Sequence, residues 1–139
     1  HINLFKNYKG FNLVLTEDEY FDSNLITSLR NFCNAIQLDF QVLDGLEEED
    51  FQKNQIYFTL NENDLVQTIR YTENNHWEIG KDLGIISLND SPFKQILAGG
   101  ISVISLESQQ MGQKIAEGIK NLQRINDSIE IQFVKRKSL

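Results

Sequence analysis

The sequence predicts an α/β fold, a three-layer parallel sheet with helices on both faces. Strand-like and helix-like segments alternate almost throughout the 139 residues, and this order builds parallel sheets. Some strand-like segments are continuous apolar runs, as expected of strands that are buried on both faces. The length suits one ordinary domain and is too short for two independent ones.

The first part of the chain predicts strand, helix, strand and strand. Phe11–Thr16 is a short apolar run after a glycine, which is typical of a strand. The apolar positions of Asn24–Ile36 recur every three or four residues, as on one side of a helix. Leu38–Leu43 alternates apolar and polar residues, and Gln55–Leu60 is rich in β-formers. Both are therefore expected as strands.

The middle of the chain continues the alternation. Asp64–Glu73 has helical spacing, and His76 and Trp77 follow where they are expected to pack at the helix end. Leu83–Leu88 is an apolar run of strand length. A short helix is expected next, because a serine that suits a cap directly precedes Pro92.

The last part predicts strand, helix and strand. The pair Gly99 and Gly100 is expected to end the short helix and form a turn. Ile101–Leu106 is expected as a strand and Gln109–Leu122 as a helix with one apolar side. Ile129–Val134 closes the sheet as a further strand.

Composition excludes several classes of protein. The net charge is −7, and duplex DNA requires Lys and Arg to neutralise its phosphates, so this chain alone is a poor DNA binder. Much of the acidic excess lies in Glu17–Glu19 and Glu47–Asp50, which favours solubility. No apolar run approaches the ~20 residues of a membrane span. Because the chain opens at His1 without a methionine, it is expected to be a fragment.

Cysteine and histidine are too few for a metal centre of the usual kinds. The single cysteine, Cys33, excludes an internal disulfide, fits a reducing compartment and is expected as a small buried hydrophobe. The only histidines are His1 and His76, which argues against a zinc or copper site and against a histidine-based catalytic triad. No phosphate-binding glycine loop is present. We therefore expect no metal, no cofactor and no enzymatic activity.

Polar residues directly after the predicted strands are the candidate ligand-binding residues. In an open parallel sheet, ligands bind beyond the carboxyl ends of the strands, where loops and helix N-termini converge. Polar side chains at four such strand ends could meet a polyhydroxylated or zwitterionic small molecule there. The residues in these positions are Glu17, Asn61, Asn89 with Asp90, and Glu107.

Two alternatives remain open for these residues. Asn after a strand is also the ordinary cap of the next helix, so Asn61 and Asn89 are as well explained by capping as by binding. Glu17, Asp18 and Glu19 could hold Mg²⁺ as in a phosphoacceptor domain. That chemistry also requires an aspartate where Asn61 stands, so a solvated loop is the preferred interpretation.

The second half of the chain resembles the effector domains of bacterial transcriptional regulators. The segment GKDLGIISLNDSPFKQILAGGISVISLESQQMGQKIAEGI (Gly80–Ile119) resembles the C-terminal part of lactose-repressor-type effector domains. IYFTLNENDLVQTIR (Ile56–Arg70) is similar to their asparagine-containing strand–helix unit, and IQFVKRKSL to their closing strand, which often reads LVxRxS. The blocks keep their order over Phe11 to Leu139, and variants behind GntR-type winged-helix domains look most similar.

The resemblance implies one lobe of a periplasmic-binding-protein-like type I fold. In that family, two lobes clamp an effector, often a sugar, and the chain crosses between the lobes. Residues 1–139 would then form the second lobe with its crossing segments, as a fragment. Residues 1–10 would be the tail of a first-lobe helix, 11–100 the core, 101–127 a crossover strand and helix, and 128–139 the closing strand.

The resemblance also assigns roles residue by residue. Asn61 matches the asparagine that hydrogen-bonds the effector, and Asn89 matches an effector-binding aspartate. Asp90 matches the acidic residue that follows, which is more often structural. Phe32 matches the aromatic residue that packs the first helix. Glu107 falls on the crossover, where an acidic residue is common.

The chain departs from the family pattern at several of these positions. Ser28 stands where sugar-binding members carry an arginine and is for that reason the fifth predicted ligand-binding residue, with Glu17, Asn61, Asn89 and Glu107. Asn89 replaces the aspartate, and Ser108 replaces an aromatic residue. The helix between the second and third strands is reduced to the acidic stretch Leu46–Lys53. These changes indicate an altered pocket.

The resemblance implies a cytoplasmic regulator in which a small molecule, a sugar or a related compound, changes DNA affinity. The regulator is expected as a homodimer that contacts DNA only through an upstream winged-helix or helix-turn-helix domain and has no membrane part. The alternative is a lobe of a solute-binding protein that serves a transporter. An enzyme of flavodoxin-like or receiver-like type is the third class, which the missing central aspartate disfavours.

Overall fold

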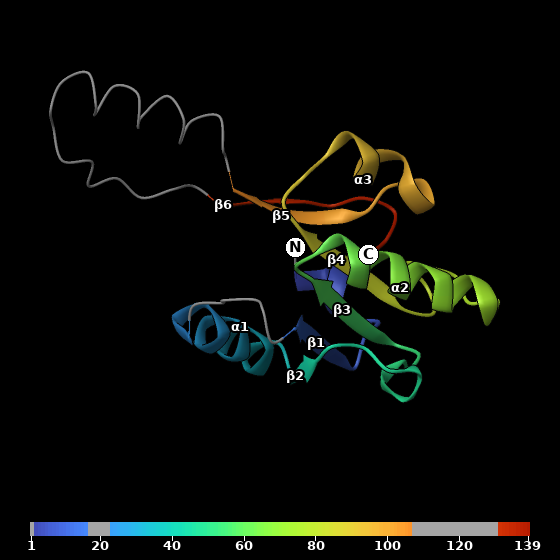
Figure 1. Ribbon diagram of the computed structural model, residues 1–139. Coiled ribbons are helices and arrows are strands. Elements are labelled where there is room, and N and C mark those ends of the chain that lie inside the picture. The colour runs from blue at the N-terminus through green and yellow to red at the C-terminus, as the bar shows by residue number, and fades with distance from the viewer. Residues whose placement is uncertain (1, 17–22, 107–130) are drawn as a thin grey trace, which may run out of the picture.

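The computed structural model describes residues 2–16, 23–106 and 131–139 (Figure 1). The predicted alternation of strands and helices is confirmed wherever the chain is described. The helix expected over Gln109–Leu122 lies outside the described residues. In chain order the elements are η1 (Ile2–Phe5), β1 (Gly10–Leu15), α1 (Ser23–Ala35), β2 (Asp39–Asp44), η2 (Glu48–Asp50), β3 (Gln55–Thr59), α2 (Glu62–Asn74), β4 (Gly84–Leu88), α3 (Pro92–Ile96), η3 (Leu97–Gly99), β5 (Ser102–Leu106) and β6 (Ile131–Val134).

The six strands form one sheet in the order β2-β1-β3-β4-β5-β6. The first five strands of this order pair in parallel. Strand β6 pairs antiparallel with β5, with Val103 opposite Val134. The predicted parallel sheet is confirmed for five strands, and the sequence made no prediction for the direction of β6, because the apolar pattern of a short strand reports its burial but not its direction.

One face of the sheet packs against α1. Its core includes Phe11, Leu13 and Phe58 from the strands, together with Cys33 from α1. The prediction that Cys33 is a buried hydrophobe is confirmed, since its side chain is fully buried and burial raises the pKa of its thiol to about 11. Phe32 is 39% exposed and its ring meets the edge of Phe5 at 5.5 Å. The apolar stripe of α1 is thus only partly buried.

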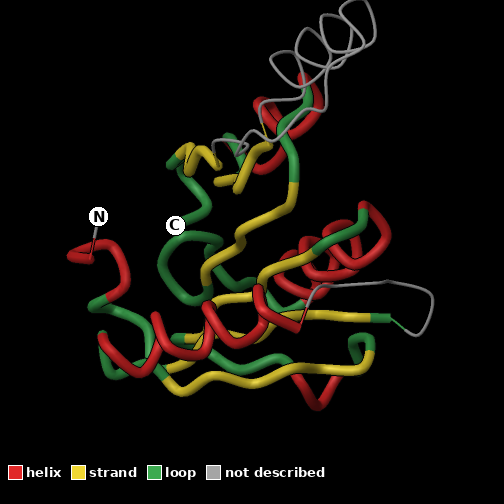
Figure 2. The backbone as a smooth tube through the Cα atoms, turned by 90° about the vertical axis from the view of Figure 1, so that its left-hand side faces the viewer, coloured by secondary structure: helices red, strands yellow, loops and turns green. Residues whose placement is uncertain are grey.

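The other face of the sheet packs against α2 and η2, which gives the predicted three layers (Figures 1 and 2). Its core includes Val14 and Tyr57 from the strands and Leu65 from α2. Phe51, just after η2, stacks on Tyr71 with ring centroids 4.1 Å apart. Trp77 meets the edge of Tyr71 at 5.3 Å, as expected of an aromatic residue at the end of α2.

The sheet is left partly open at β2, where the family pattern has a helix. The acidic stretch forms only the three-residue η2, as the reduced length predicts. Asp39 and Gln41 on β2 are consequently exposed. A hollow of about 220 Å³ lies beside them, lined also by Asn12, Glu49 and other polar residues.

Two chain segments outside the strand–helix units complete the core. Phe5 and Tyr8 from the N-terminal segment are buried in the cluster on the α1 face. Ser138 and Leu139, after β6, are also buried. A Cβ atom on Gly84 would lie 2.9 Å from Leu139 Cδ1 and 3.0 Å from Tyr8 Cζ, so a larger residue there would force these two side chains to shift away from β4.

Within the three described stretches of the chain, every helix falls short of the length and apolar content that a membrane crossing demands.

Candidate functional site

The candidate site is the carboxyl edge of the sheet, where β3 and β4 lead into α2 and α3. Of the five predicted ligand-binding residues, Glu17 and Glu107 lie outside the described residues. Ser28 is exposed on α1, and its Oγ donates to the carbonyl of Asn24 one turn earlier, at 2.8 Å. Asn61 and Asn89 lie at the carboxyl ends of two paired strands. The structure gives these two asparagines different surroundings.

Asn61 is the cap of α2. Its Oδ1 accepts a hydrogen bond from the backbone N–H of Asp64 at 2.8 Å, which is the usual capping contact. Its Nδ2 donates to the Asp64 carboxylate, also at 2.8 Å. Both ends of the amide are therefore engaged by the first turn of the helix, and the capping alternative describes the observed contacts of Asn61.

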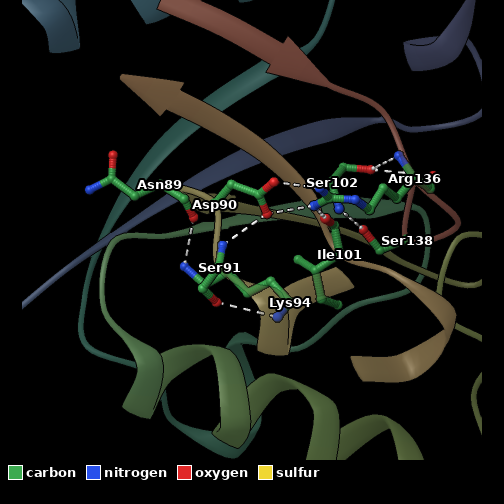
Figure 3. Close-up of polar contacts among 8 residues, drawn as sticks. All are labelled: Asn89, Asp90, Ser91, Lys94, Ile101, Ser102, Arg136 and Ser138. Atoms are coloured by element: carbon green, nitrogen blue, oxygen red, sulfur yellow. Dashed lines mark hydrogen bonds and ion pairs between the residues drawn. The ribbon is translucent and has the colours of Figure 1, made fainter. Parts of the chain in front are cut away.

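Asn89 is held by its backbone and leaves its side chain exposed. Its backbone has φ 59°, in the left-handed region that asparagine tolerates better than most residues. Its N–H donates to the carbonyl of Ile104 on β5 at 2.7 Å. Its side-chain amide points away from Asp90 and Ser91 (Figure 3). The cap of α3 is Ser91, whose Oγ accepts from the Lys94 N–H at 3.3 Å, so Asn89 is not a cap.

A buried lysine underlies this loop. Lys94 is only 4% exposed, and its Nζ donates to the carbonyls of Leu88 at 2.7 Å and of Asn89 at 3.0 Å. Burial lowers the pKa of Lys94, and the charges of Glu62 and Asp90 oppose that shift. The sequence did not predict that Lys94 is buried, because a lysine in a short amphipathic helix is ordinarily solvated.

A bidentate ion pair ties the same loop to the closing segment of the chain. Arg136 Nη2 and Nη1 lie 2.6 and 2.9 Å from the two carboxylate oxygens of Asp90 (Figure 3). Hydrogen bonding to Arg136 holds the pKa of Asp90 below its usual range. Nη1 also donates to the carbonyl of Ile101 at 2.7 Å. The structural role expected for Asp90 agrees with these contacts.

The serine of the closing segment connects β4 to β5. Ser138 is fully buried, and its Oγ donates to the carbonyl of Ile85 at 2.7 Å and accepts from the N–H of Ser102 at 2.8 Å. Its backbone carbonyl accepts from the Ile85 N–H at 2.8 Å. The sequence VKRKS supplies both Arg136 and Ser138. Its similarity to the closing-strand motif was therefore a signal for these contacts, although it did not name the partners.

The arrangement at this edge suits hydrogen bonding. The exposed amide of Asn89 offers one acceptor and two donor hydrogens, which match hydroxyl or carbonyl groups. Among residues 2–16, 23–106 and 131–139, no group of three or more His, Cys, Asp or Glu is arranged to hold a metal ion. A larger hollow of about 560 Å³ lies along α2 beside Phe51 and Tyr71, and neither Asn61 nor Asn89 lines it.

Comparison with solved structures identifies the fold. The chain is similar to a LacI family transcriptional regulator from Bifidobacterium animalis subsp. lactis, with a TM-score of 0.73 and 15% identity, over 99% of this chain and 57% of that one. It is similar to a periplasmic binding protein/LacI transcriptional regulator from Alkaliphilus metalliredigens, complexed with D-xylulofuranose (TM-score 0.72, 13% identity, 98% and 59% coverage). It is also similar to the dimeric Lac repressor with an 11-residue C-terminal deletion (TM-score 0.75, 13% identity, 99% and 57% coverage).

The fold is that of a periplasmic-binding-protein-like type I lobe. At these identities the likeness concerns the fold. The chain spans 57 to 59% of the length of these three structures. No protein-family model matches the chain, and no curated protein sequence matches it either. The three structures are of LacI type and lend no support to the GntR-type variant of the resemblance.

Proposed function

We propose that this chain is an effector-sensing lobe of a LacI-like transcriptional regulator, which binds a sugar or related small molecule at the carboxyl edge of its sheet. The observation that carries the proposal is the exposed amide of Asn89, held at the end of β4 in a lobe with this fold. Open α/β sheets bind ligands at this edge. One structure of similar fold contains D-xylulofuranose.

The proposed mechanism is a shift between two conformations of the regulator. An effector that binds between this lobe and a second one stabilises the closed arrangement and so changes the population that binds DNA. This requires different affinities for the two conformations. The net charge of −7 is unsuited to DNA, so the contact with DNA belongs to another domain, of winged-helix or helix-turn-helix type. Cytoplasmic localisation and a homodimer follow from the same proposal.

The roles of the asparagines follow from their contacts. Asn89 is proposed to hydrogen-bond the effector, since its side chain faces outward at the edge. Asn61 is proposed to act mainly by capping α2, which orients the helix N-terminus toward the same edge. For Glu17, Ser28 and Glu107 a part in effector binding remains a proposal that rests on the family resemblance.

The test is a thermal-shift screen of the complete gene product that contains this chain, against sugars, sugar acids and nucleosides. A concentration-dependent rise in Tm for one compound is expected. Asn89→Gly should abolish that rise. Glycine is chosen because it tolerates the φ of 59° that alanine would strain.

The matched control is Asn54→Gly. Asn54 also has a positive φ, 62°, but it precedes β3 and so lies at the opposite, amino edge of the sheet. The Asn54→Gly variant should show the same rise in Tm with the compound as the wild type. Absence of a shift for every compound, or an equal response in both variants, would count against effector binding at this edge.

A solute-binding protein for a transporter is the second candidate, because the structure that contains D-xylulofuranose is described as a periplasmic binding protein/LacI transcriptional regulator. The two candidates differ in what precedes the lobes in the gene. A DNA-binding domain there would support the regulator, whereas a secretory signal would support the solute-binding protein.

A further inference from the structure

The loop between β4 and α3 is held from two directions by cations. Lys94 Nζ lies beneath the loop and binds two successive carbonyls, those of Leu88 and Asn89. Arg136 binds both carboxylate oxygens of Asp90, which lies 46 residues earlier in the chain (Figure 3). The side chains of Arg136 and Asp90 are only 17% and 27% exposed, so the pair is partly shielded from water.

The conformation of Asn89 requires such support. A left-handed backbone is less populated than an extended one for any residue other than glycine. Asn89 adopts it while its N–H is directed at Ile104 on β5. Release of the loop would let Asn89 relax toward the extended region and redirect its side chain.

The contacts of Lys94 and Arg136 fall on the residues that flank and include Asn89. Lys94 fixes the carbonyls of the two successive peptides that flank the Cα atom of Asn89. Arg136 fixes the next side chain, and Asp90 Oδ1 also accepts from the N–H of Ser91 at 2.9 Å. The loop is thus restrained at three consecutive residues, whereas the side-chain amide of Asn89 forms none of these contacts.

We propose that Lys94 and Arg136 are positioning residues, which together clamp the loop so that the Asn89 amide is presented at the carboxyl edge of the sheet. The purpose of the clamp rests on the proposed function. Its effect on the conformation of Asn89 does not depend on that function and can be measured without an effector. Neither cation needs to touch the effector.

Amide hydrogen exchange followed by NMR tests the clamp without any ligand. The exchange rate of the backbone N–H of Asn89, which is hydrogen-bonded to Ile104, reports opening of the loop. The exchange rate of the backbone N–H of Phe58, in the central strand β3, reports global unfolding. Lys94→Met removes one arm of the clamp, and Asp90→Asn weakens the other by removing the negative charge and one of the two oxygens that bind Arg136. Both keep the approximate size of the side chain. In both variants, exchange of Asn89 is expected to accelerate at least tenfold more than exchange of Phe58.

Lys53→Met is the matched control, because Lys53 forms an exposed ion pair with Asp82 at 2.9 Å, outside the loop. It should leave the ratio of the two exchange rates unchanged. If Lys94→Met does not fold, Asp90→Asn decides the test, since its side chain lies at the surface of the loop. The clamp is refuted if Asn89 exchanges no faster, or accelerates only in parallel with Phe58, which is the signature of a general structural role.

The experiment separates the clamp from the proposed function. Accelerated exchange of Asn89 together with an empty ligand screen would support the clamp and refute effector sensing. Unchanged exchange together with a ligand response that depends on Asn89 would refute the clamp and leave effector sensing intact.

Discussion

Three serines allow the same chemical change, Ser→Ala, to be made in three different environments. Ser138 is buried with two hydrogen bonds to its Oγ. Ser87 on β4 is also fully buried, but its Oγ has no hydrogen-bond partner among the residues that the structure describes. Ser28 is exposed on α1. The change in volume is the same at each position, and Ser138 and Ser87 are both fully buried, so the difference in stability between these two variants reports the hydrogen bonds.

The expected magnitudes follow from the contacts. Ser138→Ala removes two hydrogen bonds of about 0.5–1.5 kcal/mol each and leaves the buried N–H of Ser102 and carbonyl of Ile85 without their partner, so a loss on the order of 2–4 kcal/mol is expected. Ser87→Ala removes a hydroxyl that is buried without a partner, and should be neutral or stabilise by about 1 kcal/mol. Ser28→Ala should raise stability by at most about 0.5 kcal/mol, because alanine favours helix.

Urea denaturation followed by circular dichroism measures all three variants. The midpoint should fall for Ser138→Ala and hold or rise for the other two, with the slope m unchanged. Loss of stability at Ser87 equal to that at Ser138 would refute the reasoning, because burial alone would then explain both results.

Three further predictions concern other parts of the chain. Asn61→Ala should destabilise the protein by about 1 kcal/mol in the same urea assay, because it removes the cap contact with Asp64; no change would contradict the capping role. The pKa of Asp90 is lowered by Arg136, so the stability that the carboxylate contributes should be present above the ordinary carboxyl pKa and disappear as pH falls through the folded value. The difference in unfolding free energy between wild type and Asp90→Asn should therefore shrink below about pH 4, and a difference that does not change with pH would exclude this linkage. Cys33, with its pKa raised to about 11 and its side chain fully buried, should react with a thiol reagent only after unfolding, and rapid labelling of the native protein would show that α1 opens.

Much of the fold could be predicted because it depends on local periodicity. The apolar runs of β1, β3 and β4 and the helical spacing of α1 and α2 fall within a few residues of the expected bounds. The cap at Ser91 with Pro92 after it was likewise predicted and is observed. The antiparallel direction of β6 was not predicted, because a strand of four residues has the same pattern in either direction.

The candidate site was predicted only as a location. The rule that ligands meet the carboxyl edge named both asparagines, but it could not separate them, because a cap and a ligand-binding amide look alike in sequence. In the structure Asn61 caps α2 through Asp64, whereas Asn89 caps no helix and its side chain is exposed. Lys94 was missed, because the burial of a lysine depends on carbonyls that converge from elsewhere in the loop.

The sequence by itself determined the alternation of strands and helices, the buried faces and the helix caps, since each depends on residues within a few positions of one another. Only the tertiary structure decided that Arg136 binds Asp90 and that Ser138 joins β4 to β5, over separations of 46 and 53 residues. Such contacts depend on how the elements pack together, and the periodicity of a segment carries no information about its distant partners. For that reason, the candidate edge of the sheet was visible in the sequence, and the residues that hold its loop in shape were not.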